Sequence, residues 1–293
     1  MDSEETLISD MQRLEPGPDV LIHGYRLGQV LGRGAQGTVY LATLEGDPQS
    51  YAVKLVDIRH LAAQVIDRLV RECELTAKLD HPGIVRVYEA GYWGDHIFIV
   101  MEVALGRAAD RFANGALGWR RAVEIARQAA VALAHAHAHA HDLHGVIHRD
   151  IKPANLVIEL DGQLIAGVKI VDFGLSRSVD DQIGGLTMTG AVMGTPFYMS
   201  PEQCVDAPPS RFMDIYAIGC MFFHLVTGRT PYQARNAAML MISHMQEPPP
   251  TFDGIATVGK GSQYLLKRCL AKNPKDRSRT MRRSPMPRNR PFC

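Results

Sequence analysis

Cysteine is scarce in this sequence and follows no paired spacing. Five cysteines occur among 293 residues, at positions 73, 204, 220, 269 and 293. Their odd number and wide scatter exclude a dense disulfide framework and a zinc site built from closely spaced cysteines. We therefore expect buried or inactive thiols in a reducing compartment, and a cytoplasmic protein.

Long apolar runs and a strong charge of one sign are also absent. The longest apolar stretch, Ile215 to Val226, is interrupted by Gly219 and His224 and is shorter than the roughly 20 residues that a membrane span needs. The polar, acidic first residues do not form a secretory signal. A formal net charge of +1 creates no overall field for nucleic acid or anionic lipid. We expect no membrane segment and no nucleic-acid partner.

The first part of the chain is predicted to be rich in β-strands. Residues 1–23 carry Pro16-Gly17-Pro18 and no periodicity, which indicates a flexible leader. Short β-branched and aromatic runs then predict strands, and a helical period predicts one helix over 61–79 with Val65, Leu69, Cys73 and Thr76 on one face. The predicted strands cover residues 25–31, 38–42, 51–56, 84–89 and 97–103.

After about residue 117 the pattern becomes mostly helical. An Ala-rich run predicts a helix over 119–141, and a hairpin turned by Asp161-Gly162 follows. Further helices are predicted over 211–228, 234–246 and 261–272. The sequence thus predicts an α+β fold of two lobes, 24–104 and 105–280, followed by a basic irregular tail over 281–293.

Four motifs carry candidate chemistry, and the first is a glycine-rich segment from Gly32 to Val39. Gly32, Gly34 and Gly37 stand between two predicted strands, where glycine lets backbone N–H groups approach phosphate oxygens. A strand on both sides argues against a dinucleotide-binding fold, which needs a strand and then a helix. A glycine-rich hairpin turn without a ligand is the alternative.

The second motif pairs a lysine with a glutamate. Lys54 ends an apolar strand, and a cation that faces phosphates needs a partner to fix its long side chain. Glu72, on the following helix, is the candidate partner. Glu74 is the competing one, but it lies about 200° further round the helix and faces away if Glu72 faces inward.

The third and fourth motifs are highly specific. In the segment from His148 to Asn155, Asp150 can accept the proton of an attacking hydroxyl, Lys152 can neutralise a phosphoryl group, and Asn155 can hold a metal ion. Asp172-Phe173-Gly174 follows a predicted strand, and its carboxylate is a hard oxygen ligand suited to Mg²⁺.

In this order and spacing the four motifs resemble the protein kinase superfamily over residues 25 to 280. The segment from Gly194 to Gln203 looks most like that of bacterial serine/threonine kinases, and Lys152 is the Ser/Thr-type signature. The resemblance implies ATP and Mg²⁺ (or Mn²⁺) as cofactors, protein substrates, and self-association for autophosphorylation. The implied function is transfer of the γ-phosphoryl group of ATP to Ser or Thr hydroxyls; the alternative is an ATP-binding scaffold of kinase fold with little activity.

The resemblance also implies roles for further residues. Arg149 marks control by phosphorylation of the activation loop, for which Thr187 and Thr189 are the expected sites. Glu202 would pair with Arg277, Asp214 would hold the catalytic loop, and Thr195 would lie at the substrate site. The implied ATP-binding residues are Leu31, Gly32, Gly34, Gly37, Val39, Ala52, Lys54, Met101, Glu102, Val103 and Val157.

Three features depart from the family pattern. A run of alternating histidines, His135 to His144, precedes the catalytic loop; an i, i+4 pair could hold a metal ion, and a repeat-expanded helix end is the simpler interpretation. Thr76 stands where relatives carry a larger aliphatic side chain, which weakens the expected packing. After Arg277 the chain turns rich in arginine and proline, so no closing amphipathic helix is expected.

Overall fold

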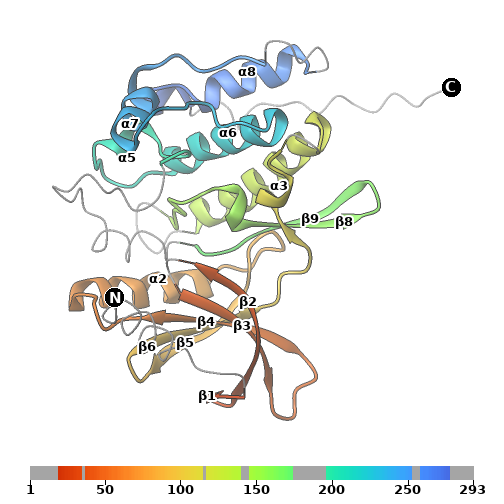
Figure 1. Cartoon of the computed structure of the whole chain (residues 1–293), viewed down its shortest axis with the longest axis vertical. Coiled ribbons are helices and arrows are strands. Elements are labelled where there is room, and N and C mark those ends of the chain that lie inside the picture. Colours follow the sequence, from red (N-terminus) through yellow and green to blue (C-terminus); the bar gives the residue numbers. More distant parts are fainter. Residues whose placement is uncertain are drawn as a thin grey trace, which may run out of the picture. The chain divides into compact units, whose positions relative to one another are not determined.

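The computed structural model describes residues 19–34, 37–114, 117–139, 145–173, 196–252 and 258–277. These residues form two compact units, and each is described by itself. The first unit is a β-sheet, and the second is mainly helical (Figure 1). The predicted α+β class is confirmed. Among the described residues, no helix combines the length and the apolar character that crossing a membrane requires.

The first unit contains the described residues up to His60 together with Val87–Val103, and its sheet is antiparallel with the order β1-β2-β3-β4-β6-β5. Alternating side chains pack one face of the sheet into a core that includes Tyr40, Val53, Leu55 and Phe98. The strands are β1 (Leu21–Ile22), β2 (Tyr25–Gly34), β3 (Gly37–Leu44), β4 (Ser50–Asp57), β5 (Val87–Trp93) and β6 (His96–Glu102).

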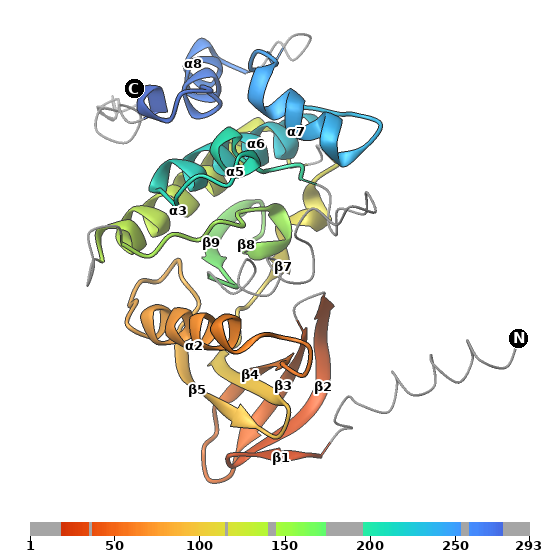
Figure 2. The same ribbon diagram turned by 90° about the vertical axis from the view of Figure 1, so that its left-hand side faces the viewer.

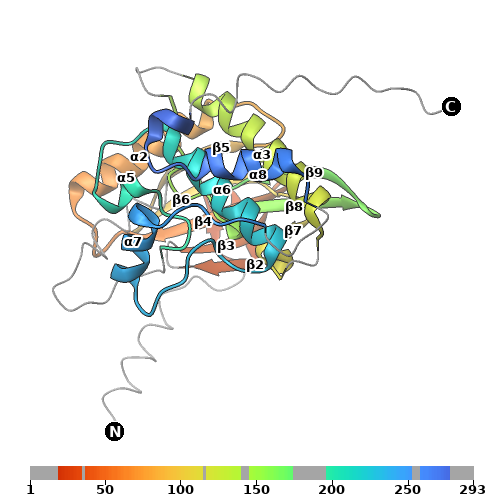
Figure 3. The same cartoon turned by 90° about the horizontal axis from the view of Figure 1, so that it is seen from above.

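The second unit contains Leu61–Arg86 and the described residues from Ala104 to Arg277. Its core surrounds α6, which is apolar on all sides, as expected of a central helix. The helix α6 packs against α3 and α8, and β9 packs against α3 (Figures 1, 2 and 3). The principal helices are α2 (Ala63–Ala77), α3 (Trp119–Ala138), α5 (Pro201–Cys204), α6 (Arg211–Thr227), α7 (Ala237–Gln246) and α8 (Lys260–Cys269).

Short elements complete the second unit. They are the strands β7 (Arg107–Ala108), β8 (Leu156–Asp161) and β9 (Leu164–Ile170), and the 3₁₀ turns η1 (Ala109–Phe112), η2 (Pro153–Asn155) and η3 (Pro274–Arg277). The three strands form one antiparallel sheet in the order β7-β8-β9.

One predicted strand, 84–89, is divided between the two units. The structure begins β5 only at Val87, while Ile84 forms a parallel bridge to Ile170 of β9. Val85 N–H donates to the Ile170 carbonyl at 2.9 Å, and Ile170 N–H donates to the Gly83 carbonyl at 2.9 Å. A continuous apolar run does not reveal that its two ends pair with different sheets.

Helix α2 buries the face that the sequence predicted. Val65, Leu69, Cys73 and Thr76 are its buried residues, which confirms the helical period. The hydroxyl of Thr76 donates to the Glu72 carbonyl at 2.8 Å, so this buried polar group is satisfied within the helix.

Candidate functional site

The carboxylate of Asp214 holds the backbone that leads to Asp150. Oδ1 accepts the Arg149 N–H at 2.8 Å, and Oδ2 accepts the His148 N–H at 3.0 Å. Asp214 is fully buried on α6. A buried carboxylate is stable only when it is hydrogen-bonded, and this one fixes two successive backbone amides of the loop that leads to Asp150.

His137 is a third partner of Asp214 that the sequence did not single out. Its Nε2 lies 2.7 Å from Asp214 Oδ2, and both side chains are almost fully buried. Burial alone would raise the pKa of the Asp214 carboxyl, but the His137 hydrogen bond and charge, with the His148 ring and amide, hold that pKa below its usual value. The alternating histidines and alanines do not indicate which histidine contacts Asp214, because only burial distinguishes His137 from its neighbours.

Two residues of the site adopt left-handed backbone conformations. Arg149 has φ 68° and Asp172 has φ 59°, and such values are uncommon for residues other than glycine. Gln203 Nε2 donates to the Arg149 carbonyl at 2.8 Å, and this hydrogen bond helps to hold the backbone conformation of Arg149. Strained backbone of this kind concentrates at functional sites.

Asp150, Lys152 and Asn155 form a hydrogen-bonded group. Lys152 Nζ donates to Asp150 Oδ2 at 2.7 Å, and Asn155 Nδ2 donates to the same oxygen at 3.0 Å and to the Asp150 carbonyl at 2.8 Å. Among the described residues, Asp150 Oδ1 accepts no hydrogen bond. The group therefore presents an orientated carboxylate oxygen next to a cation, which is an arrangement able to receive a proton from a hydroxyl.

Asp172 lies two residues after the end of β9, next to Val171, whose backbone contacts Asn155. Val171 N–H donates to the Asn155 carbonyl at 3.0 Å, and the Val171 carbonyl lies 3.0 Å from His148 Nε2. Both amide protons of Asn155 point toward Asp150, so its Oδ1 is left as an acceptor. An amide oxygen and a neighbouring carboxylate are the donor types that fit Mg²⁺.

Four predicted ATP-binding residues share one face of the first unit's sheet. Val39 pairs with Lys54 across β3 and β4, and Ala52 pairs with Met101 across β4 and β6. Paired residues of neighbouring strands lie on the same face, as do residues two apart on one strand. This face is opposite to the one that carries Val53 and forms the core of the unit.

The three glycines of the first motif differ in their surroundings. A Cβ at Gly32 or Gly34 would meet nothing within 4 Å, while a Cβ at Gly37 would lie 1.9 Å from the Leu55 carbonyl oxygen. Gly37 also has φ +126°, so the fold itself requires glycine there. Nothing in the packing of the described chain requires glycine at the first two positions.

The remaining predicted adenine-site residues are distributed over both units. Leu31 is exposed on β2, Glu102 ends β6, and Val103 is the last residue of the first unit. Val157 belongs to the second unit, where it pairs with Ala108 across β7 and β8.

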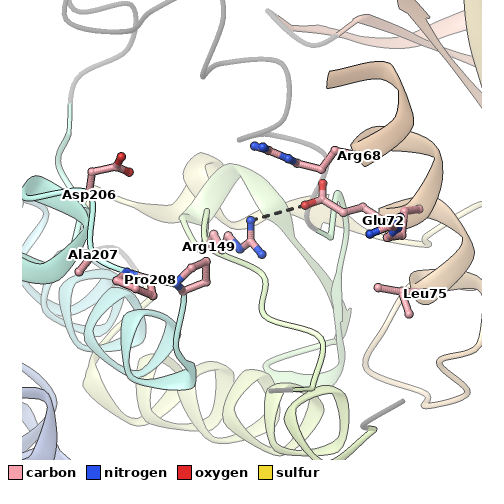
Figure 4. Close-up of a pocket in the computed structure, with 9 residues that line it drawn as sticks. Arg68, Glu72, Leu75, Arg149, Asp206, Ala207 and Pro208 are labelled. Atoms are coloured by element: carbon pink, nitrogen blue, oxygen red, sulfur yellow. Dashed lines mark ion pairs between the residues drawn. The ribbon is translucent and has the colours of Figure 1, made fainter. Parts of the chain in front are cut away.

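Glu72 and Arg149 form an ion pair in the lining of a cavity of the second unit. Arg149 Nη1 lies 3.5 Å from Glu72 Oε1, and Figure 4 shows Arg68 beside the same carboxylate. Glu72 is half-buried whereas Glu74 is exposed, in accord with the choice of Glu72 as the inward residue. The cavity has a volume of about 530 Å³. It is lined by Arg68, Arg71, Glu72, Leu75, Arg149, Asp206, Ala207, Pro208 and Pro209.

Glu202 and Arg277 form a two-pronged ion pair. Arg277 Nη1 and Nη2 donate to the two carboxylate oxygens at 2.6 and 3.0 Å, and Arg277 is fully buried. A capping box between Ser200 and Gln203 starts α5 and orientates Glu202. The remaining Arg277 donors reach the carbonyls of Ala271, Phe212 and Lys272.

The other predicted residues lie outside the described part of the chain. They are Gly174, Thr187, Thr189 and Thr195, together with the basic tail from 281 to 293.

Comparison with known proteins identifies the sequences and folds that this chain is similar to. A profile of the protein kinase domain matches residues 25–284. Serine/threonine-protein kinase PknJ of Mycobacterium bovis is 36% identical over 261 residues, covering 86% of this chain and 42% of PknJ. PknB of Mycolicibacterium smegmatis is 34% identical over 272 residues, covering 90% of this chain and 42% of PknB.

A solved kinase structure is similar to this chain in fold. The crystal structure of the Mycobacterium tuberculosis PknI kinase domain matches with a TM-score of 0.69 and 25% identity, and covers 89% of this chain and 94% of that domain. The chain spans about two fifths of the length of the curated relatives that it matches, 42% in both cases given above.

Proposed function

The chain belongs to the protein kinase family, in its serine/threonine branch, and we propose that this domain transfers the γ-phosphoryl group of ATP to Ser or Thr hydroxyls of protein substrates. The observation that carries the proposal is the group formed by Asp150, Lys152 and Asn155. Asp150 Oδ1 accepts the proton of the attacking Ser or Thr hydroxyl. The oxygen of that hydroxyl forms a bond to the γ-phosphorus, and ADP leaves.

Lys152 supplies positive charge to the same step. Its ammonium group is held 2.7 Å from Asp150 and faces the oxygen atoms of the phosphoryl group in transfer. Because little covalent chemistry is left to the protein in this reaction, positioning and charge supply most of the catalysis.

Asn155 and Asp172 are the residues that would hold a divalent cation, Mg²⁺ or Mn²⁺. Such an ion, when bound, neutralises charge on the phosphates of ATP. The free Oδ1 of Asn155 supports this assignment, as does the position of Asp172 directly after Val171.

The sheet of the first unit supplies the proposed nucleotide-binding face. Val39 and Ala52 contribute apolar surface for adenine, Met101 borders it, and Lys54 contributes a cation for phosphate. The open space at Gly32 and Gly34 supports close approach of phosphates to the backbone there. Leu31 and the backbone of Glu102 and Val103 complete the proposed ATP-binding residues of this unit, and Val157 is the one proposed from the second unit.

We further propose regulation by autophosphorylation, with Thr187 and Thr189 as acceptors, Thr195 at the substrate site, and a second copy of the chain as the enzyme. Arg149 would pair with the new phosphate, which carries nearly two negative charges. Mass spectrometry before and after incubation with ATP tests the sites, and phosphate found only at other residues contradicts them. The free thiols of Cys73, Cys204, Cys220 and Cys269 support a reducing, cytoplasmic location.

The decisive experiment is transfer of label from γ-labelled ATP and Mg²⁺ to a generic protein substrate. Asp150→Asn should lower the rate by at least about a hundredfold, because the general base is lost. Asp161→Asn, at the exposed turn of the β8–β9 hairpin, is the matched control and should keep the rate.

Two results would contradict the proposal. One is full activity of Asp150→Asn. The other is no label with the natural chain although Mg·ATP raises its melting temperature, which would favour an ATP-binding scaffold.

A further inference from the structure

Three histidine rings gather where α3 ends, and none of them is among the residues assigned above. His135 and His139 stand one turn apart, with ring centroids 4.6 Å from each other. The ring of His81, which follows α2 in the chain, lies 5.0 Å from that of His135. All three residues belong to the second unit. The alternating histidine run therefore does more than extend a helix, because it places two imidazoles on one face beside a third.

The spacing of His135 and His139 matches that of two rings on one metal ion. Zinc binds imidazole nitrogen at about 2.0–2.1 Å, so two ring centroids on one tetrahedral ion are about 5 Å apart. The 4.6 Å between these rings is close to that value, and the rings are tilted by 40° rather than stacked flat. Two histidines at i and i+4 on a helix are a recognised arrangement for zinc. Here His135 lies in the last turn of α3 and His139 is the C-cap residue that follows it.

The Nε2 atom of His135 is an unsatisfied polar atom. It is buried and has no hydrogen-bond partner among the described residues. Such atoms are rare in folded proteins, because burial removes the hydrogen bonds that water would supply. A metal ion bound through this nitrogen, after a small rotation of the ring, would supply the missing partner.

His81 lies beside this pair but is not one of its ligands. Its Nδ1 accepts the Gly83 N–H at 3.0 Å, which leaves the proton of the neutral ring on Nε2.

We propose that His135 and His139 form a two-histidine binding site for a divalent transition-metal ion of the kind that prefers imidazole, with Zn²⁺ as its representative and water completing the coordination. The described residues contain no group of three or more His, Cys, Asp or Glu side chains arranged to hold a metal ion, so the site is weaker than a structural zinc site. It is chemically distinct from the oxygen ligands Asn155 and Asp172, which suit Mg²⁺.

Occupancy of this site would brace the last turn of α3. That turn carries His137, which contacts Asp214, and the Ala136 carbonyl, which accepts the Val146 N–H at 3.0 Å. An ion that joins residues i and i+4 holds the turn closed. Zn²⁺ should therefore raise the melting temperature of the chain as well as bind to it.

The test is calorimetric titration of Zn²⁺ into the chain without an affinity tag, at pH 7.5. We expect one equivalent to bind, and His135→Gln, His139→Gln and the double variant to weaken binding at least tenfold. His60→Gln, an exposed histidine of the first unit, is the matched control and should leave the affinity unchanged. Lowering the pH to 5.5 should weaken binding to the natural chain, because protons compete for imidazole.

Spectroscopy on the same proteins identifies the ligands. With Cu²⁺ as the probe, paramagnetic resonance should show coupling to two imidazole nitrogens in the natural chain and to one in His139→Gln. His139 is exposed, so its variant is expected to fold, and melting without metal checks this.

Unchanged affinity in the folded double variant would overturn the proposal. The proposal would also be overturned if tight Zn²⁺ binding survived in the double variant and was lost on replacing His141 and His144 with glutamine. These two histidines lie outside the described residues.

Discussion

Arg149 Nη1 and Glu72 Oε1 lie 3.5 Å apart, so two residues to which the sequence assigned different partners contact one another. Arg149 is expected to receive a phosphate, and Glu72 to orientate Lys54. Both side chains are partly buried, where an ion pair is screened less than at the surface. A phosphate in the arginine-lined cavity would compete with Glu72 for Arg149 (Figure 4).

Replacement of Arg149 should uncouple activity from phosphorylation. In Arg149→Gln, the ratio of activity between ATP-treated and phosphatase-treated protein should fall at least about tenfold toward one, because the charged partner of the phosphate is lost. Steady-state rates of the two preparations measure this ratio. Arg107→Gln changes an exposed arginine and should keep the natural ratio. A natural ratio in Arg149→Gln would refute the role given to this residue.

Replacement of His137 should affect kcat more than the KM for ATP. His137→Gln removes a buried partner of Asp214, which costs about 1–3 kcal/mol of stability and loosens the backbone amides of His148 and Arg149. We expect kcat to fall about tenfold or more while the KM for ATP changes little. His139→Gln, in buffer freed of transition metals, is the control on the same helix end. Equal effects of the two variants would argue against a positioning role.

His244 should make stability depend on pH. Burial and the neighbouring Lys272 hold the pKa of His244 at about 4, against an ordinary value of 6.5. The folded state therefore binds fewer protons than the unfolded state between these values, so the stabilisation is complete above pH 6.5 and is lost as the pH falls toward 4. The whole effect is on the order of 3 kcal/mol.

Chemical denaturation from pH 4 to pH 7 measures that dependence. His244→Gln should flatten it, because the titrating group is absent, even though the contact with the Tyr216 hydroxyl at 2.9 Å also changes. His96→Gln serves as a control on a histidine of the first unit. If the free energy of unfolding of His244→Gln still falls with decreasing pH as in the natural chain, other groups cause the pH dependence.

Replacement of Arg277 by lysine should be costly although the charge is kept. Lysine cannot reproduce the two-pronged contact with Glu202 or the bonds to three carbonyls. We expect a loss of about 3 kcal/mol, because polar groups remain buried without partners. Thermal melting measures it, with the exposed Arg235→Lys as control. A melting temperature equal to that of the control would show that the pair contributes little.

Local sequence patterns were sufficient to predict those groups of side chains whose members lie close together in the chain. Asp150, Lys152 and Asn155 lie within six residues, so a single loop brings them into contact. The helical period likewise identified the buried face of α2, including Thr76. Glu202 and Arg277 were paired through family resemblance, and the structure joins them across a sequence separation of 75 residues.

The sequence by itself determined the fold class, most helices and strands, and the residue types of the catalytic loop, because these follow from periodicity and short spacing. Only the tertiary structure decided which histidine of a repetitive run reaches Asp214, which partner Arg149 contacts, and that Ile84 pairs with β9 rather than with β6. Such choices depend on burial and on contacts between distant segments. A repeat or a continuous apolar run has the same local pattern whichever of its residues is buried.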